Sequence, residues 1–176
     1  MTSRPSGSPS QASGAAGQIF AANERINQML IEEIDPSAWT ARAPANVRTI
    51  AAIFSHMHNV RCKWIRLTAP HLESPAQLKR SQCTPEQVRM GLAGSAEGCV
   101  VMLGEALGGA ESRVKTFRRD GWAQPWSAGP AMLCYMIAHE AHHRGQVCML
   151  AHQLGSKLPN RVTSAMWSWE RLWKES

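Results

Sequence analysis

A pair of histidines near the end of the chain is the strongest chemical signal in the sequence. The run from His139 to Gln146 reads HEAHHRGQ and lies inside a stretch with a helical pattern. His139 and His143 are four residues apart, so their imidazoles leave the same face of a helix one turn apart. Two imidazoles in this relation can chelate one divalent cation, and the spacing therefore predicts a metal site.

A second helix must supply the third ligand, and the segment that reads SHMH offers two histidines for this role. His56 and His58 point about 200° apart on a helix, so at most one of them faces the same centre as the pair. Periodicity alone does not choose between them. Three imidazoles from two facing helices would leave positions open for water or substrate, as in a catalytic metal site. A fourth ligand such as Cys62 or His58 would close the site and favour a structural role.

Three neighbours of these histidines are candidates for supporting roles. His142 points about 100° away from His143 on the helix. It replaces His143 as the ligand, supports a ligand or substrate from beside the metal, or lies at the surface. Gln146 shares the face of the histidine pair, where it could orient a ligand, bind substrate or lie at the rim of the fold. Trp64, two turns after His56, belongs either to a substrate pocket or to the core.

The same run also matches the H-E-x-x-H pattern of zinc peptidases. In that alternative, Glu140 would be the general base that acts on a metal-activated water. The longer peptidase motif is absent, because Gln146 and Met149 stand where a glycine and a third histidine would be. On a helix Glu140 points about 100° away from the ligand direction. We therefore favour another metal-dependent reaction over peptide hydrolysis.

The elements that position these residues are predicted to be helices. The chain has 176 residues, a length that fits a single domain. Apolar periodicity and helix start and stop signals predict helices at about 18–34, 47–68, 84–107, 129–154 and 163–174. Asn46 is the expected N-cap of the second helix, Thr84 and Gln87 can form a capping box, and Gly155 suits the end of the fourth helix. The pattern predicts an all-α four-helix bundle with a short extra C-terminal helix.

The first residues are expected to lie outside this domain. Residues 1–17 are rich in Ser, Gly, Ala and Pro, carry one charge at Arg4 and lack the apolar segment of a signal peptide. Their composition predicts a disordered N-terminal segment, which leaves residues 18–176 as the metal-binding helical domain.

Composition also limits the compartment and the partners. The five cysteines show no C-x-x-C spacing, which is typical of reduced thiols in a cytoplasmic protein. No apolar run approaches the roughly 20 residues that a membrane-spanning helix needs. The net charge is +6, but the basic residues are dispersed and no nucleic-acid-binding motif accompanies them. We therefore expect no membrane or nucleic-acid partner, although the charge favours anionic small substrates.

The sequence resembles the DinB/YfiT-like family of metal-dependent enzymes. The resemblance rests on His56 with Trp64, on the segment 139–146, and on the end of the same helix at 149–155. It covers the chain from about residue 18 to residue 159. It implies an up-down-down-up four-helix bundle, usually a homodimer.

The resemblance also implies a divalent metal ion held by three histidines, which are His56, His139 and His143 in this chain. The ion is expected to be nickel or zinc, while iron, manganese and copper are alternatives that the same donors accept. Relatives include thiol-dependent S-transferases and a thiol-dependent isomerase of maleylpyruvate. We therefore expect a metal-dependent enzyme that activates a water or a low-molecular-weight thiol, for hydrolysis or S-transfer on a small molecule. No general base can be assigned among Glu140, His58 and His142.

The alternative is a non-catalytic, stress-related bundle that binds a metal or another ligand. The openness of the metal site separates the two hypotheses, because a catalytic ion needs an exchangeable position and a structural ion does not.

Overall fold

The chain folds mainly into helices, as the sequence predicts. The structure is a computed structural model that describes residues 9–43, 47–80, 82–110 and 112–174. Within these residues the helices are α1 (Pro9–Glu33), α2 (Pro36–Trp39), α3 (Ile50–Thr68), α4 (Pro85–Ala106), α5 (Pro130–Gln153), α6 (Asn160–Ala165) and α7 (Trp169–Lys174). The two strands are β1 (Thr116–Phe117) and β2 (Trp126–Ser127). The prediction of an all-α protein is therefore confirmed.

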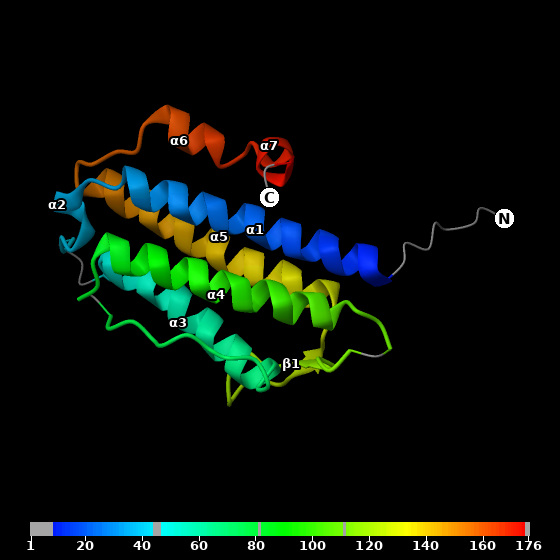
Figure 1. The fold of residues 1–176 in the computed structure, drawn as a ribbon. Helices are drawn as coiled ribbons and strands as arrows, with labels where there is room; N and C mark the ends of the chain where they lie inside the picture. The colour runs from blue at the N-terminus through cyan, green and yellow to red at the C-terminus, as the bar shows by residue number, and fades with distance from the viewer. Residues whose placement is uncertain (1–8, 44–46, 81, 111, 175–176) are drawn as a thin grey trace.

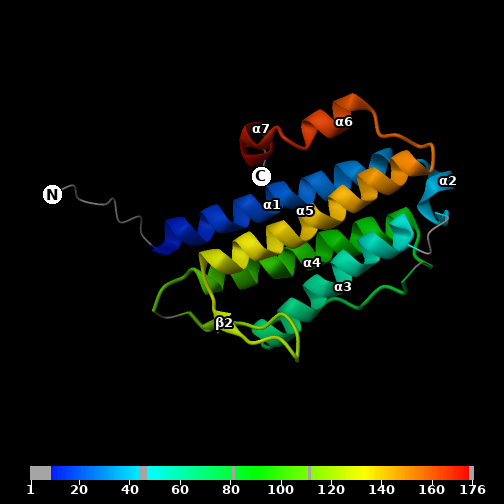
Figure 2. The same cartoon turned by 180° about the vertical axis from the view of Figure 1, so that it is seen from behind.

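The four long helices lie side by side, and both views show this arrangement (Figure 1, Figure 2). Helix α1 contacts α4 and α5, and α3 contacts the same two helices. Helices α1 and α5 run in one direction along the molecule, while α3 and α4 run in the other (Figure 1). The arrangement places α3 beside α5, so the two helices that carry the candidate ligands are neighbours.

The predicted signals at the ends of α4 and α5 are confirmed. Thr84 Oγ1 accepts a hydrogen bond from the Gln87 amide at 3.2 Å, and Gln87 Oε1 accepts one from the Thr84 amide at 2.9 Å. This reciprocal capping box satisfies two amides that the first turn of α4 leaves free. Gly155 follows α5 with a φ of 79°, which glycine adopts without steric cost.

Helix α3 begins later than the sequence predicts. Its N-cap is Thr49, whose Oγ1 accepts a hydrogen bond from the Ala52 amide at 3.2 Å. Asn46, the predicted cap, lies outside the described residues. The predicted C-terminal helix is also different, because residues 166–168 interrupt it and divide it into α6 and α7.

The prediction of disorder for residues 1–17 is wrong for residues 9–17, which form the first turns of α1. Small side chains let this segment pack closely against α4. A Cβ on Gly17 would lie 3.1 Å from an α4 side chain, and Ser13 Oγ donates a hydrogen bond to the Gly104 carbonyl at 2.9 Å. The small residues that are typical of disordered segments here give α1 a surface without bulky side chains, which can approach α4 closely.

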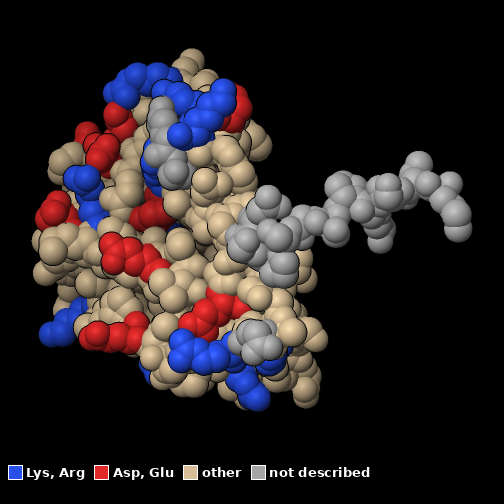
Figure 3. Space-filling model, turned by 45° about the vertical axis from the view of Figure 1, so that its right-hand side comes forward, with Lys and Arg blue, Asp and Glu red and all other residues tan. Residues whose placement is uncertain are grey.

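Two observations describe the surface of the described residues, one on its helices and one on its charges. None of the helices in the described part of the chain combines the length and the apolar character that crossing a bilayer requires. On the face shown in Figure 3, lysines and arginines form separate groups that alternate with acidic and neutral side chains.

Candidate metal centre

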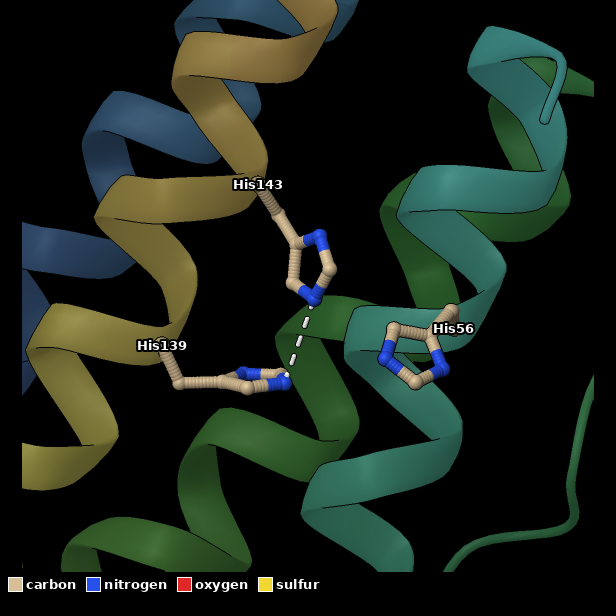
Figure 4. A group of neighbouring side chains, drawn as sticks. All are labelled: His56, His139 and His143. Atoms are coloured by element: carbon tan, nitrogen blue, oxygen red, sulfur yellow. Dashed lines mark hydrogen bonds between the residues drawn. The ribbon is translucent and has the colours of Figure 1, made fainter. Parts of the chain in front are cut away.

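Three imidazoles from α3 and α5 converge between the two helices (Figure 4). One nitrogen of each of His56, His139 and His143 lies within 4.8 Å of the chosen nitrogens of the other two. The ring centroids are 4.5 Å apart for His139 and His143, and 4.8 Å apart for His56 and His143. The rotation of α3 therefore settles the choice that periodicity leaves open, and His56 is the histidine that faces the pair.

The nitrogen positions fit the geometry of a metal site. His139 Nε2 and His143 Nε2 are 3.2 Å apart. Two nitrogens bound at about 2.0–2.1 Å to one tetrahedral ion would be about 3.3–3.4 Å apart. His56 Nδ1 and His139 Nδ1 are buried and have no hydrogen-bond partner among the described residues. Because His139 meets His143 through Nε2, its Nδ1 is not the nitrogen that a shared ion would bind.

The environment keeps the imidazoles neutral, which is the state that binds metal ions. Burial, together with the charge of nearby His143 and Arg48, lowers the pKa of His56 to about 3. Burial and the charge of His143 lower the pKa of His139 to about 4. Burial also lowers the pKa of His143. At neutral pH all three rings therefore offer a lone pair without first losing a proton.

Gln146 makes the contact that an orienting residue requires. Its Oε1 accepts a hydrogen bond from His143 Nδ1 at 2.8 Å, and its Nε2 donates to His142 Nε2 at 3.0 Å. A neutral His143 that donates through Nδ1 carries its lone pair on Nε2, the nitrogen that faces His139. His142 is exposed and does not join the three converging rings, so it does not replace His143.

The two side chains that could have closed the site lie elsewhere. His58 is fully buried on the opposite side of α3, where its Nδ1 lies 3.1 Å from Ser95 Oγ and its Nε2 donates to the Ala76 carbonyl at 2.9 Å. Cys62 Sγ lies 3.4 Å from His58 Nε2. Among the described residues, no further His, Cys, Asp or Glu completes the three-histidine group.

Glu140 does not occupy the position that the peptidase alternative needs. The carboxylate is completely buried, with Oε1 2.6 Å from Arg61 Nε and Oε2 2.7 Å from Arg61 Nη2. Asn23 and Asn27 donate further hydrogen bonds to Oε2 at 2.7 and 2.8 Å. Both oxygens are engaged in the core and unavailable to a water molecule. Glu140 is therefore not placed to act as the general base of the peptidase alternative.

Sequence reasoning missed this buried polar network, although the sequence carries a signal for it. Arg61 lies one turn from the core residues Met57 and Ile65, and Asn23 and Asn27 lie on the stripe of α1 that faces the core. Polar side chains on an otherwise apolar helical stripe are rarely buried without partners. Such positions therefore predict a network, but they do not say which helix provides each partner.

Trp64 is a core residue that also supports the site. Its side chain is 1% exposed, and its ring meets His139 edge-on with centroids 5.2 Å apart. The same ring packs against Phe117 and Tyr135. Trp64 therefore forms the wall behind His139 and does not line the space in front of the histidines.

An open cleft of about 1100 Å³ lies in front of the three histidines. Apolar side chains of α3 and α5 form one part of its lining, and they include Ile53, Met149 and Leu150. Arg48, His142 and Gln146 provide polar groups around the same space. The converging imidazoles are thus accessible to a small molecule.

Comparison with known proteins agrees with the resemblance drawn from the motifs. A model of the DinB family matches residues 12–171 of the chain. Searches of curated proteins and of solved structures found no significant match. The family match includes all three converging histidines and begins within α1. Because it spans most of the sequence, the chain belongs to the DinB family.

Proposed function

We propose that His56, His139 and His143 hold one divalent metal ion and that the protein is a metal-dependent enzyme acting on a small molecule. The reaction class is hydrolysis or S-transfer with a low-molecular-weight thiol. The observation that carries this proposal is the convergence of three neutral imidazoles at an open cleft, without a fourth protein ligand among the described residues. A site of this kind leaves positions for water, thiol or substrate.

The family resemblance favours nickel or zinc, with iron, manganese or copper as alternatives, and three imidazoles by themselves do not choose among such ions. When bound, such an ion lowers the pKa of a coordinated water or thiol, so that a nucleophile forms at neutral pH. The protein contributes the three nitrogens and the orientation of His143 through Gln146. Ile53 and Leu150 provide an apolar wall that excludes water from part of the cleft.

His142 is the residue to which we assign proton transfer. Of the three candidate bases, Glu140 and His58 are fully buried and hydrogen-bonded within the core. His142 is exposed, lines the cleft and lies next to His143, with ring centroids 5.1 Å apart. It is therefore the candidate that can exchange a proton with a molecule in the cleft.

We also infer that the four long helices form the up-down-down-up bundle that the family resemblance implies, and that the protein acts as a homodimer. The neighbour relations and directions of the helices support the first inference. The second rests on the family resemblance alone and is tested by the molecular mass in solution.

A substrate screen tests the enzymatic proposal. Metal-loaded protein is incubated with chromogenic esters, and separately with small electrophiles together with glutathione, cysteine or N-acetylcysteine. We expect turnover that disappears with His143→Ala and persists with His152→Ala, a control on the same helix outside the histidine group. Protein that binds metal but turns over no ester or thiol would contradict the enzymatic proposal and favour the non-catalytic metal-binding alternative.

A further inference from the structure

A second hollow adjoins the cleft at the beginning of α3. It has a volume of about 350 Å³ and lies between residues 40–43, which follow α2, and the beginning of α3. Val47 and Arg48 line both the hollow and the histidine cleft, so the two spaces are neighbours. Arg42 and Arg80 complete the charged part of the lining, to which none of the described acidic residues contributes.

The three arginines of this hollow have no acidic partners in the described part of the chain. Ion pairs there involve other arginines, namely Arg61, Arg89, Arg113, Arg144 and Arg161. Arg42, Arg48 and Arg80 are instead exposed around a common space. Three like charges around one small hollow create a positive potential that attracts an anion.

Two further observations concern the binding of an anion in this hollow. The first turn of α3, with Thr49 and Ala52, lines the hollow, and the amino end of a long helix carries a partial positive charge. Arg48 also lines the histidine cleft together with His56. An anion held by this arginine would therefore lie in the space that the histidine group faces.

The two spaces together define the shape of a matching molecule. The cleft offers apolar side chains such as Ile53, Met149 and Leu150 close to the histidines. The hollow offers guanidinium groups, which bind carboxylate and phosphate oxygens through paired N–H donors. A molecule with an apolar body and one oxyanion group would use both surfaces at once.

We propose that Arg42, Arg48 and Arg80 bind the oxyanion group of the substrate, a carboxylate or a phosphate, while its apolar part extends toward the three histidines. The inference rests on the proposed metal-dependent function and narrows its substrate class to small amphiphilic anions. It assigns a binding role, with no chemical step, to the arginines.

Binding of matched probes tests this assignment. Hexyl phosphate, hexanoate and hexanol share one apolar chain and differ in the head group, and their affinities are measured by calorimetry at low ionic strength. The proteins are the wild type, the double variant Arg48→Gln/Arg80→Gln and the control Arg66→Gln, which removes an exposed arginine at the other end of α3. Each protein is measured with metal and after chelation.

We expect at least one anion to bind the wild type and Arg66→Gln at least about tenfold more tightly than hexanol, and to lose about tenfold or more in the double variant. The anion that binds more tightly identifies the head group. Equal affinity for hexanol, or anion binding that is unchanged in the double variant, would overturn the assignment. Anion binding that requires the metal but is indifferent to the arginines would overturn it as well.

Metal content is determined on the same samples, so the two proposals fail separately. Metal-loaded protein without arginine-dependent anion binding contradicts only the substrate assignment. Protein that takes up no metal contradicts the proposed function, whatever the result with the anions.

Discussion

Arg61 of α3 and Glu140 of α5 form a two-point ion pair in which neither side chain has any exposed surface. Arg61 lies five residues after His56, and Glu140 directly follows His139. The pair therefore connects the two helices that carry the candidate ligands, close to the three histidines. Burial alone would raise the pKa of Glu140, but the charge of Arg61 and the hydrogen bonds to the carboxylate lower it overall.

Removing one partner of this pair is expected to destabilise the fold strongly. Glu140→Ala removes the carboxylate that meets Arg61 at two points and leaves Glu24, 2.7 Å from Arg61 Nη2, as the remaining counter-charge. We expect a cost of about 3 kcal/mol in the free energy of unfolding, the lower end of the range for a broken buried pair. Urea denaturation monitored by circular dichroism measures this loss.

Glu33→Ala is the matched control, because it breaks an ion pair with Arg161 at the surface. An exposed pair contributes at most about 1 kcal/mol. If Glu140→Ala costs no more than Glu33→Ala, the buried pair does not hold α3 and α5 together as described.

Gln146→Ala is expected to weaken metal binding while leaving all three histidines in place. Without the acceptor on His143 Nδ1, the ring can rotate and its lone pair is no longer directed at the site. Loss of such an orienting partner lowers metal affinity by about 10- to 100-fold. Competition with a chromophoric chelator measures the affinity.

Two variants sharpen this test. Gln146→Glu keeps an oxygen acceptor and should retain most of the affinity, whereas Gln153→Ala removes another glutamine of the cleft lining and should change little. Equal affinities for Gln146→Ala and the wild type would show that the contact with His143 does not orient the ring.

The stability of the metal-free protein is expected to fall as the pH decreases from about 6.5 toward 4. In the unfolded chain a histidine titrates near pH 6.5, while burial lowers the pKa of His56 to about 3 and that of His139 to about 4 in the folded chain. Between these values the unfolded state binds more protons, so acidification favours unfolding. Thermal unfolding of chelator-treated protein across this range measures the effect.

His56→Gln should reduce the slope of melting temperature against pH. His58 keeps part of the slope, because burial lowers the pKa of His58 as well. The control His152→Gln replaces an exposed histidine of α5 and should leave the slope as it is in the wild type. A slope that is identical in His56→Gln and the wild type would contradict burial of a neutral His56.

Local rules predicted the parts of the site that lie on one helix. The four-residue spacing of His139 and His143 places both rings on one face, and Gln146 follows on the same face. The capping box likewise depends on two residues of one helix start, Thr84 and Gln87. In each case the geometry of a single helix is sufficient.

Features that depend on contacts between helices could not be predicted from the sequence of a single helix. The rotation of α3 selects His56 over His58, and the side-chain partners of Arg61 and Glu140 come from α1, α3 and α5. Residues 9–17 have a composition that is typical of disorder, yet they are helical because α4 offers a close-fitting surface. Packing between helices decides each of these outcomes. The apolar periodicity of a single segment does not predict how that segment packs against the others.

The most direct test of the metal site is elemental analysis of purified protein after dialysis against nickel or zinc. The proposal predicts one bound ion per chain in the wild type and in His152→Ala, and strongly reduced metal in His56→Ala, His139→Ala and His143→Ala. Wild-type protein without bound metal, or three alanine variants that all retain it, would contradict the three-histidine centre.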